Sequence, residues 1–277
     1  MVMIKNPITV VSSGGGGDVN YLPYRVSNIE NYSYSDNTIT NLKRGAFQYD
    51  ERIVAVDFPN VDIVPVNAFY QCTSLNSVNF SSSLKEINAS AFYGCTSLSS
   101  INLPDTLVNV GNYVFTNTAI PRNYSGGINY IGNANNQYFI TDKIDNVNSN
   151  NCVVHSNTKI ISGGTFLNCR YLISVTGMDN VVSLGNSAFQ NCSQLATITL
   201  PKVNLIDANV FSGCGYLAAI YLQSTTVCTL LNANAIPATA SHNITIYVPS
   251  NLISSYQTAT NWSTLYNNGY ITFAAIS

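Results

Sequence analysis

A small residue followed by Phe recurs seven times along the chain, and this repeat constrains the fold more than any other feature. Successive Phe residues are 22 or 23 positions apart, except for one interval of 51 between Phe115 and Phe166. A Cys follows three positions after most of them, then a Leu or Ile, then another apolar residue three further on. Self-similarity at a fixed period indicates a repeat architecture in which each unit is one structural coil. The seven Phe positions are Phe47, Phe69, Phe92, Phe115, Phe166, Phe189 and Phe211.

One repeat unit shows how such a coil folds. Residues 98–103 alternate apolar and polar side chains, as a half-buried strand does, and Pro104 ends the segment because proline cannot donate to a strand ladder. A second extended piece, residues 107–110, leads to the next small residue and Phe. A coil of this length cannot bury its own apolar residues, but stacking at about 4.8 Å gives a continuous core. The repeat therefore predicts a β-rich solenoid with a parallel sheet.

The pattern AFxxCxxLxxIxLPxxLxxV, seen most fully from Ala91 to Val110, resembles the BspA-like leucine-rich repeats. These repeats occur in surface proteins of gut and oral bacteria, of some protozoa, and of phages or prophages. The resemblance covers about Thr38 to Leu222. It implies a leucine-rich-repeat-like stack of 22–23-residue coils with a parallel sheet and capped ends, used for adhesion or partner binding rather than catalysis.

We predict three regions along the chain. Residues 1–37 form an N-terminal leader strand, a Gly-rich hinge and a cap; residues 38–222 form the solenoid, with an insertion at 120–163; residues 223–277 form a C-terminal cap. The insertion is expected to contain two strands around a turn, 130–132 and 138–140, and to keep one solenoid continuous. In the cap we expect strands at 244–248 and 270–275, a short helix after Pro249, and Trp262, Leu265 and Tyr266 covering the last coil.

Charge excludes several classes of partner. Asp, Glu, Lys and Arg make up only 9% of the residues, and 11 basic against 13 acidic side chains give a net charge of −2. Binding to a nucleic acid backbone or an anionic membrane surface needs clustered Lys and Arg, so we expect neither. No apolar run approaches the ~18 residues of a membrane-spanning helix, so we expect no membrane insertion.

The cysteines and histidines are weak evidence for metal or catalytic chemistry. The repeat puts most of the seven cysteines at an inward position, where a reduced thiol behaves as a small apolar residue, although bridges between neighbouring coils stay open. His155 and His242 are isolated, and neither a Gly-x-Ser-x-Gly motif nor a paired Cys motif is present. We expect no metal, no cofactor and no catalytic residues; Asp50, Glu51 and Asp57 are interpreted as a solvated edge.

The predicted strands also define a candidate binding surface. In each Leu-x-x-Ile-x-Leu segment the third and fifth residues should face outward, which gives small, neutral, hydroxyl- and amide-bearing side chains, and Ala219 at one position. Such a face can bind a glycan or a protein partner, with Tyr221 able to stack on a sugar ring; alternatively, these residues only solubilise the sheet. The candidate binding residues are Asp57, Ser77, Asn79, Ser100, Asn102, Thr176, Thr197, Thr199 and Tyr221.

The sequence thus predicts a non-catalytic recognition or adhesion protein, displayed on a bacterial surface or a phage particle. The absence of a recognisable signal peptide and the tetraglycine hinge (residues 14–17) favour a virion protein for host recognition, and the leader is a possible site of homo-oligomerisation. The alternative is a structural tail or decoration component of a phage without its own ligand. A carbohydrate-active enzyme is a more distant alternative, because facing carboxylates can come from distant coils.

Overall fold

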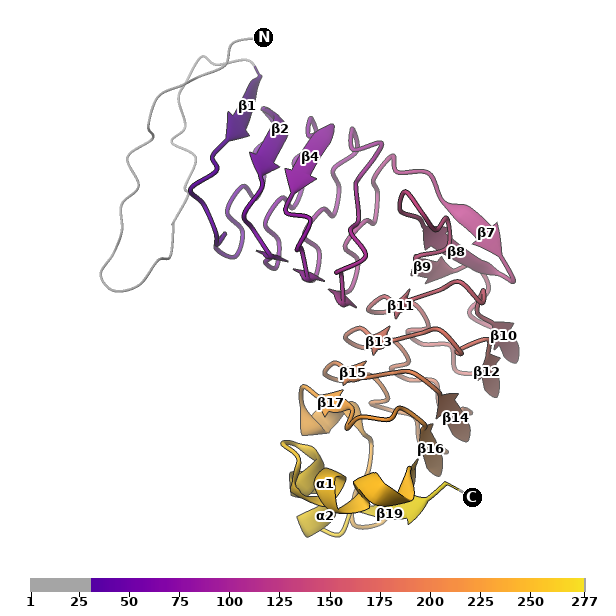
Figure 1. Ribbon diagram of the computed structural model, residues 1–277. Helices are drawn as coiled ribbons and strands as arrows, with labels where there is room; N and C mark the ends of the chain where they lie inside the picture. Colours follow the sequence, from indigo (N-terminus) through magenta and orange to yellow (C-terminus); the bar gives the residue numbers. More distant parts are fainter. Residues whose placement is uncertain (1–30, 277) are drawn as a thin grey trace. The chain divides into compact units, whose positions relative to one another are not determined.

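A computed structural model describes residues 31–276, so the predicted leader strand and glycine hinge lie outside the described residues (Figure 1). The chain divides into two compact units. The N-terminal unit runs to Arg122 and takes in Asn133–Asn135, and the C-terminal unit comprises Asn123–Gly132 and the chain from Asn136 onward. Both are built of short parallel strands separated by turns, as a β-solenoid requires. The boundary between the units falls within the segment 120–163, and the three-region division stays a prediction.

The N-terminal unit carries two parallel three-stranded sheets. One has the order β1 (Tyr32–Ser35), β2 (Ile53–Phe58), β4 (Ser77–Phe80), and the other β3 (Ile63–Val64), β5 (Glu86–Ile87), β6 (Asn109–Val110). Neighbouring strands pair in register between coils, so that Val56 lies opposite Val78 and Val64 opposite Ile87. The predicted extended piece at 107–110 is confirmed in its second half, where Asn109–Val110 form β6.

The predicted strand at residues 98–103 is wrong in this detail. Leu98 and Leu103 are buried as expected, yet the segment is not a strand, and the first sheet ends at β4. The coils are linked just before it, where the Ser97 N–H donates to the Thr73 carbonyl at 3.2 Å. Apolar alternation determines which side chains point inward, whereas a strand also needs a continuous hydrogen-bonded ladder to its neighbour.

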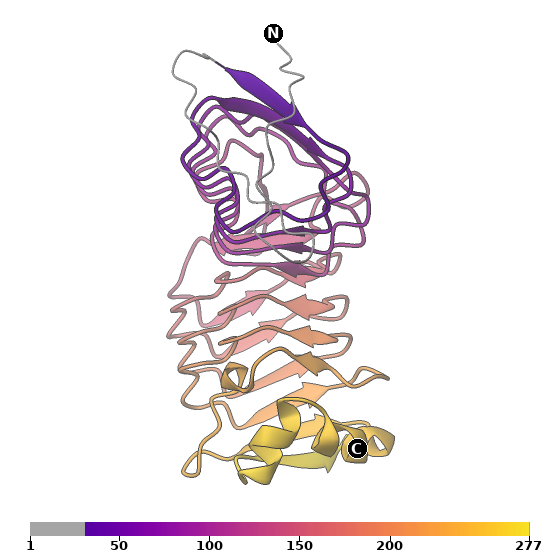
Figure 2. The same cartoon turned by 90° about the vertical axis from the view of Figure 1, so that its left-hand side faces the viewer.

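The C-terminal unit repeats this plan over more coils. Along one side lie β10 (Asn151–Val153) with β12 (Ser174–Thr176), then a sheet of order β14 (Thr197–Leu200), β16 (Ala219–Leu222), β18 (Ile244–Val248), β19 (Ile271–Ala275). Along the other side a seven-stranded sheet has the order β17 (Thr229–Leu230), β15 (Leu205–Ile206), β13 (Ser183–Leu184), β11 (Ile160–Ile161), β9 (Ile140–Ile144), β8 (Ile128–Ile131), β7 (Asn123–Ser125). Figure 1 shows the two sets on opposite sides of the coils, and Figure 2 shows the coils stacked one on the next.

The predicted insertion and cap elements are largely confirmed. In the insertion, β8 pairs antiparallel with both β7 and β9, which turns the chain before the parallel coils resume at β11. At the C-terminal end β18 and β19 pair in parallel, and the chain between them forms the short helices η2 (Ser250–Leu252), α1 (Ile253–Thr258) and α2 (Trp262–Asn267). Trp262 and Leu265 are buried, whereas Tyr266 stays partly exposed. A further short helix, η1 (Ala233–Ala235), follows β17.

The core of each unit is a ladder of stacked phenylalanines. In the N-terminal unit the rings of Phe47, Phe69, Phe92 and Phe115 stack with centroids 5.2, 5.3 and 5.8 Å apart and interplanar angles of 7° or less. In the C-terminal unit Phe189 lies between Phe166 and Phe211, at 4.8 and 5.7 Å. All seven rings are almost completely buried. Burying each contributes about 1.5–3 kcal/mol, so the ladder is a main source of stability.

The repeat cysteines join neighbouring coils by hydrogen bonds. Four of the five repeat thiols donate to the carbonyl oxygen of the Phe in the preceding coil, as Cys72 does to Phe47 at 3.0 Å and Cys192 to Phe166 at 3.1 Å. Cys95 and Cys214 make the same bond. The same carbonyls also accept the backbone N–H of the residue three positions on, as Phe47 does from Asp50 and Phe166 from Cys169, so the thiol adds a second hydrogen bond that reaches between coils. This bond accounts for the recurrence of Cys at a fixed distance from Phe.

Two left-handed residues flank every Phe of the ladder, one two positions before it and one two positions after it. Their φ angles lie between +56° and +77°, a region that Gly adopts freely and Asn tolerates better than other residues. Nine of these fourteen positions are Gly or Asn, which gives these particular Gly and Asn residues a backbone role. At Gly213 a Cβ would lie 2.2 Å from Asn191 Oδ1, so a larger residue there would displace the Asn191 side chain. The positions are Gly45, Tyr49, Asn67, Gln71, Ser90, Gly94, Tyr113, Asn117, Gly164, Asn168, Ser187, Asn191, Asn209 and Gly213.

None of the helices within residues 31–276 is long and apolar enough to cross a membrane.

The left-handed positions make a testable prediction at Asn209, whose φ is +58°. Asn209→Ala should lower the free energy of unfolding by about 1 kcal/mol, because a Cβ residue without a polar side chain is strained there. Asn209→Gly should keep the wild-type stability. The measurement is urea unfolding followed by the emission of Trp262, the only tryptophan. Asn204→Ala, at an exposed position with ordinary φ, is the control; equal losses in the two alanine variants would contradict the account.

Candidate functional site

The outward face of the sheet β14–β16–β18–β19 carries two rows of side chains set by strand register. The tyrosine row is Thr199, Tyr221, Tyr247 and Ala274, and the threonine row is Thr197, Ala219, Thr245 and Thr272. Alternate residues of each strand point into the core, where Ile198, Ile220 and Ile246 lie in register. No residue of either row carries a charge. The predicted residues Thr197, Thr199 and Tyr221 are therefore brought together on one face.

Tyr221 does not stand alone on this face. Its ring stacks on that of Tyr247, with centroids 4.5 Å apart and an interplanar angle of 8°. Both side chains are half-buried, and both are held by strands that are hydrogen-bonded in register. Sequence reasoning missed Tyr247, although carrying the repeat register into the strand at 244–248 aligns Ile246 with Ile220 and so Tyr247 with Tyr221.

Ala219, expected on the outward face, is only 8% exposed. It lies in register between Thr197 and Thr245, and its single methyl group does not reach beyond these larger neighbours. Thr176 is exposed as predicted, in β12 opposite Val153, whose side chain is 60% exposed. Beside them Ser174 donates from its hydroxyl to Asn151 Oδ1 at 2.7 Å.

The N-terminal unit presents a shorter polar face centred on Asp57. The Asp57 carboxylate accepts hydrogen bonds from Ser35 Oγ at 3.0 Å and Asn79 Nδ2 at 2.7 Å, across three neighbouring strands. Ser77 is exposed two residues before Asn79. Ser100 and Asn102 are exposed too, but they lie outside the sheet. The structure thus joins Asp57, Ser77 and Asn79 on one sheet face and leaves Ser100 and Asn102 beyond its last strand.

The carboxylates and histidines considered for catalysis have separate structural roles. Asp50, expected on a solvated edge, is buried, and its Oδ1 lies 3.6 Å from Arg52 Nε. Glu51 is exposed. His155 stacks on Tyr138 with centroids 3.7 Å apart, and His242 Nε2 lies 2.8 Å from the Leu217 carbonyl oxygen. Among the described residues, no group of three or more His, Cys, Asp or Glu side chains is placed to hold a metal ion.

The predicted inward placement of the cysteines is confirmed, and all seven are free and buried. Burial raises the pKa of the Cys95 thiol from 9.0 to about 12, because the thiolate loses its hydration, even though a hydrogen bond from the Cys72 backbone partly opposes the shift. Burial likewise raises the pKa of the Cys72 and Cys228 thiols. Thiols of this kind are poor nucleophiles and act here as packing groups.

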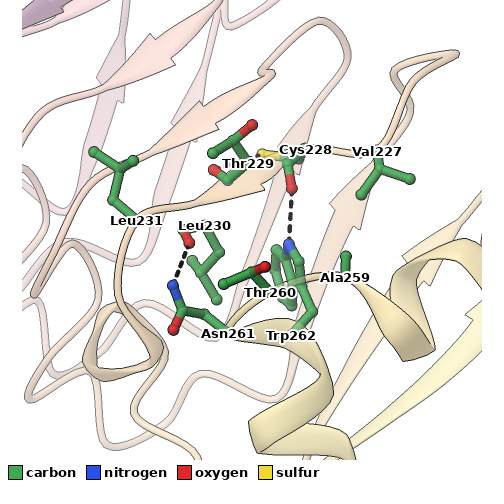
Figure 3. A pocket seen from close by; sticks show the side chains of 9 residues that line it. All are labelled: Val227, Cys228, Thr229, Leu230, Leu231, Ala259, Thr260, Asn261 and Trp262. Carbon is green, nitrogen blue, oxygen red and sulfur yellow. Dashed lines mark hydrogen bonds between the residues drawn. The ribbon is translucent and has the colours of Figure 1, made fainter.

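A cavity of about 460 Å³ lies at the end of the C-terminal unit, between β17 and the α1–α2 corner (Figure 3). β17 is the last strand of its sheet. Side chains of α1, α2 and the turn between them form hydrogen bonds with the backbone along its outer edge. The Cys228 N–H donates to the Tyr256 hydroxyl at 2.8 Å, Trp262 Nε1 donates to the Cys228 carbonyl at 2.8 Å, and Asn261 Nδ2 donates to the Leu230 carbonyl at 2.7 Å. These polar groups close a sheet edge against further pairing, which is a structural role.

Comparison with known proteins identifies the repeat. A family profile described as "BspA type Leucine rich repeat region" matches in six copies, over residues 40–151 and 143–264. No curated protein matches the sequence.

Several solved structures are similar to this chain. They include a leucine-rich repeat protein from Bacteroides ovatus (18% identity, TM-score 0.36, covering 89% of this chain and 67% of that one). A leucine-rich cell surface protein from Faecalibacterium prausnitzii is 21% identical (TM-score 0.34, 68% of this chain and 59% of that one). The pneumococcal vaccine antigen PcpA is 14% identical (TM-score 0.32, 96% and 84%). The matched region thus spans about 59% of the length of the Faecalibacterium protein.

The buried thiol of Cys95 and the buried hydroxyl of Tyr256 predict how stability depends on pH. Burial raises the pKa of Cys95 from 9.0 to about 12 and that of Tyr256 from 10.0 to about 12. Both groups are neutral in the folded and unfolded chain below pH 9, and above it the unfolded chain loses their protons first. The free energy of unfolding should therefore be constant from pH 7 to about 8.5 and fall between pH 9 and about 12.

Urea titrations across this range, read by Trp262 emission, measure the slope. Tyr256→Phe should reduce the fall above pH 10 and also cost about 1–3 kcal/mol at pH 7, since the Cys228 N–H loses its acceptor. Tyr266→Phe, which removes a partly exposed hydroxyl from the neighbouring helix, is the matched control. A Tyr256→Phe protein with the wild-type stability at pH 7 and the wild-type slope would contradict the assignment.

Proposed function

Because the chain belongs to the BspA-type leucine-rich repeat family, we propose that it is a non-catalytic recognition protein that binds a macromolecular partner through the outward face of its sheets. The observation that carries this proposal is the pair of uncharged rows on β14–β16–β18–β19, the tyrosine row and the threonine row. Together the two rows present hydroxyl and aromatic groups. Such side chains are common in recognition surfaces, because hydroxyl groups adapt their hydrogen bonds to the partner and a tyrosine loses little conformational entropy on binding.

The backbone beneath these rows supports a binding role. Each row residue sits in a strand paired with its neighbours, and the inward residues between them are buried against the core. A partner that binds here meets side chains already held in place, so little conformational entropy is lost on association. The surface therefore satisfies the requirement for a preformed recognition face.

The chemistry elsewhere in the described chain supports binding over catalysis. Asp57 is engaged by Ser35 and Asn79, and both histidines contact neighbouring groups of the scaffold. A hydrolytic site needs a nucleophile, a base and an orienting group within hydrogen-bonding reach of one another. The two histidines have other partners, since His155 Nδ1 accepts from the Asn157 N–H and His242 Nε2 lies 2.8 Å from the Leu217 carbonyl oxygen.

The place of display follows from the family resemblance, which implies the outside of a bacterial cell or of a phage particle. Mass spectrometry of a source culture separated into cytosol, envelope and phage-sized particles tests this part of the proposal. Enrichment in the envelope or in particles is the expected outcome, and recovery from the cytosol alone would contradict display.

Binding through the sheet face predicts that a charge on the tyrosine row blocks the partner. Thr199→Lys puts a long cation at an exposed position of the tyrosine row, next to Tyr221, and should weaken binding at least tenfold. The measurement is binding of labelled protein to a printed array of matrix proteins and surface glycans. Asn204→Lys, which adds the same charge at an exposed position directly before β15 of the opposite sheet, should bind like wild type. If Asn204→Lys weakens binding and Thr199→Lys does not, the interface lies on the other sheet.

A further inference from the structure

We propose that Tyr247 and Ala274 form a stacking subsite for one pyranose ring of a neutral glycan. The inference rests on the proposed function and names the class of ligand that the sheet face takes. It concerns the end of the tyrosine row at Tyr247 and Ala274. The stack of rings ends at β18, whereas the sheet continues for one more strand, β19.

The Tyr221–Tyr247 pair defines the direction of the stack. The two rings are nearly parallel, with an interplanar angle of 8° and centroids 4.5 Å apart, close to the strand spacing of about 4.8 Å. The ring planes thus stand across the inter-strand direction, and each ring turns one face toward the next strand. Tyr221 turns its free face toward Thr199, and Tyr247 turns its free face toward Ala274.

Ala274 leaves that last position open. It is in register with Tyr247, and β19 is the final strand of the sheet. Its methyl group is too short to cover a phenol ring, so we infer from the register that the outer face of Tyr247 borders an open space one strand spacing wide. The Tyr70–Tyr93 stack of the N-terminal unit is a useful contrast: its rings are also parallel, 5.0 Å apart, but Tyr49 lies edge-on against Tyr70 with centroids 5.4 Å apart and closes that end.

The groups around this space identify the ligand as a neutral sugar. Thr245 and Thr272 lie two residues before Tyr247 and Ala274 on the same face, along one side of the space. The Thr272 hydroxyl donates to Asn243 Oδ1 at 3.3 Å, which leaves its oxygen to accept a hydrogen bond from a ligand. A pyranose has an apolar C–H face for the aromatic ring and hydroxyl groups at its edge for such partners. The two rows carry no charge, so nothing in them compensates the carboxylate or sulfate of an acidic sugar. An aromatic side chain of a protein partner could use the ring but would leave the hydroxyl row unused.

The first experiment measures binding of a defined panel to the full chain by isothermal titration calorimetry. The probes are the neutral hexasaccharides of cellulose, starch, laminarin, xylan and chitin, together with one sulfated and one sialylated oligosaccharide. We expect at least one neutral probe to bind and the two acidic probes to bind at least tenfold more weakly.

Variants then locate the site. Ala274→Tyr fills the open position with a third ring, and Tyr247→Ala removes the stacking face; each should weaken binding of the neutral probe at least tenfold. Tyr124→Ala, which removes a tyrosine that is 61% exposed on β7, should bind like wild type. Far-UV circular dichroism and Trp262 emission show that each variant is folded. Wild-type affinity in folded Ala274→Tyr would overturn the subsite, as would the absence of binding to every neutral probe.

The same variants separate this inference from the proposed function. If Thr199→Lys abolishes binding to a protein on the array while Ala274→Tyr has no effect on it, the sheet face is a recognition surface and the sugar subsite is wrong. If Thr199→Lys and Ala274→Tyr both leave every array signal unchanged, the proposed function fails as well.

Discussion

The ladder of stacked phenylalanines is the interaction on which the remaining structure depends. Each ring lies flat on the ring of the next coil, and a cysteine thiol bonds the carbonyl of the Phe one coil back. Together these contacts fix both the spacing and the register of neighbouring coils. Side chains point alternately to the two faces of a strand. Once core packing determines which residues point inward, it also determines which residues face outward. The recognition face is therefore a consequence of core packing.

The backbone around each Phe shows how composition serves this ladder. Two left-handed residues, one on each side, turn the chain so that the ring points into the core. Gly and, to a lesser degree, Asn accept such angles at low cost, and together they occupy nine of the fourteen positions. The ladder itself uses no charged side chain, and the outward rows of the C-terminal unit carry none. The Gly and Asn residues beside each Phe thus have their structural origin in the repeat.

Sequence alone predicted what depends on apolar periodicity and failed where local geometry decides. The inward ladder, the cap strands and the outward position of Tyr221 follow from the repeat, and the structure confirms them. The strand expected around Ser100 is not formed. The prediction failed because apolar alternation does not determine whether the backbone hydrogen-bonds to the next coil. Ala219 is buried since exposure depends on the size of its neighbours, and Tyr247 was missed because it lies outside the last full repeat.

The most direct test of the ladder is the stability of Phe189→Ala. Phe189 is fully buried between two stacked rings in the C-terminal unit, which also holds the reporter Trp262. Urea unfolding followed by Trp262 emission should show a loss of about 3–5 kcal/mol in the free energy of unfolding. Removing the ring leaves a cavity that the coils on its two sides cannot fill. A loss below about 1 kcal/mol, the size expected for an ordinary substitution, would contradict the claim that the stack holds the coils together.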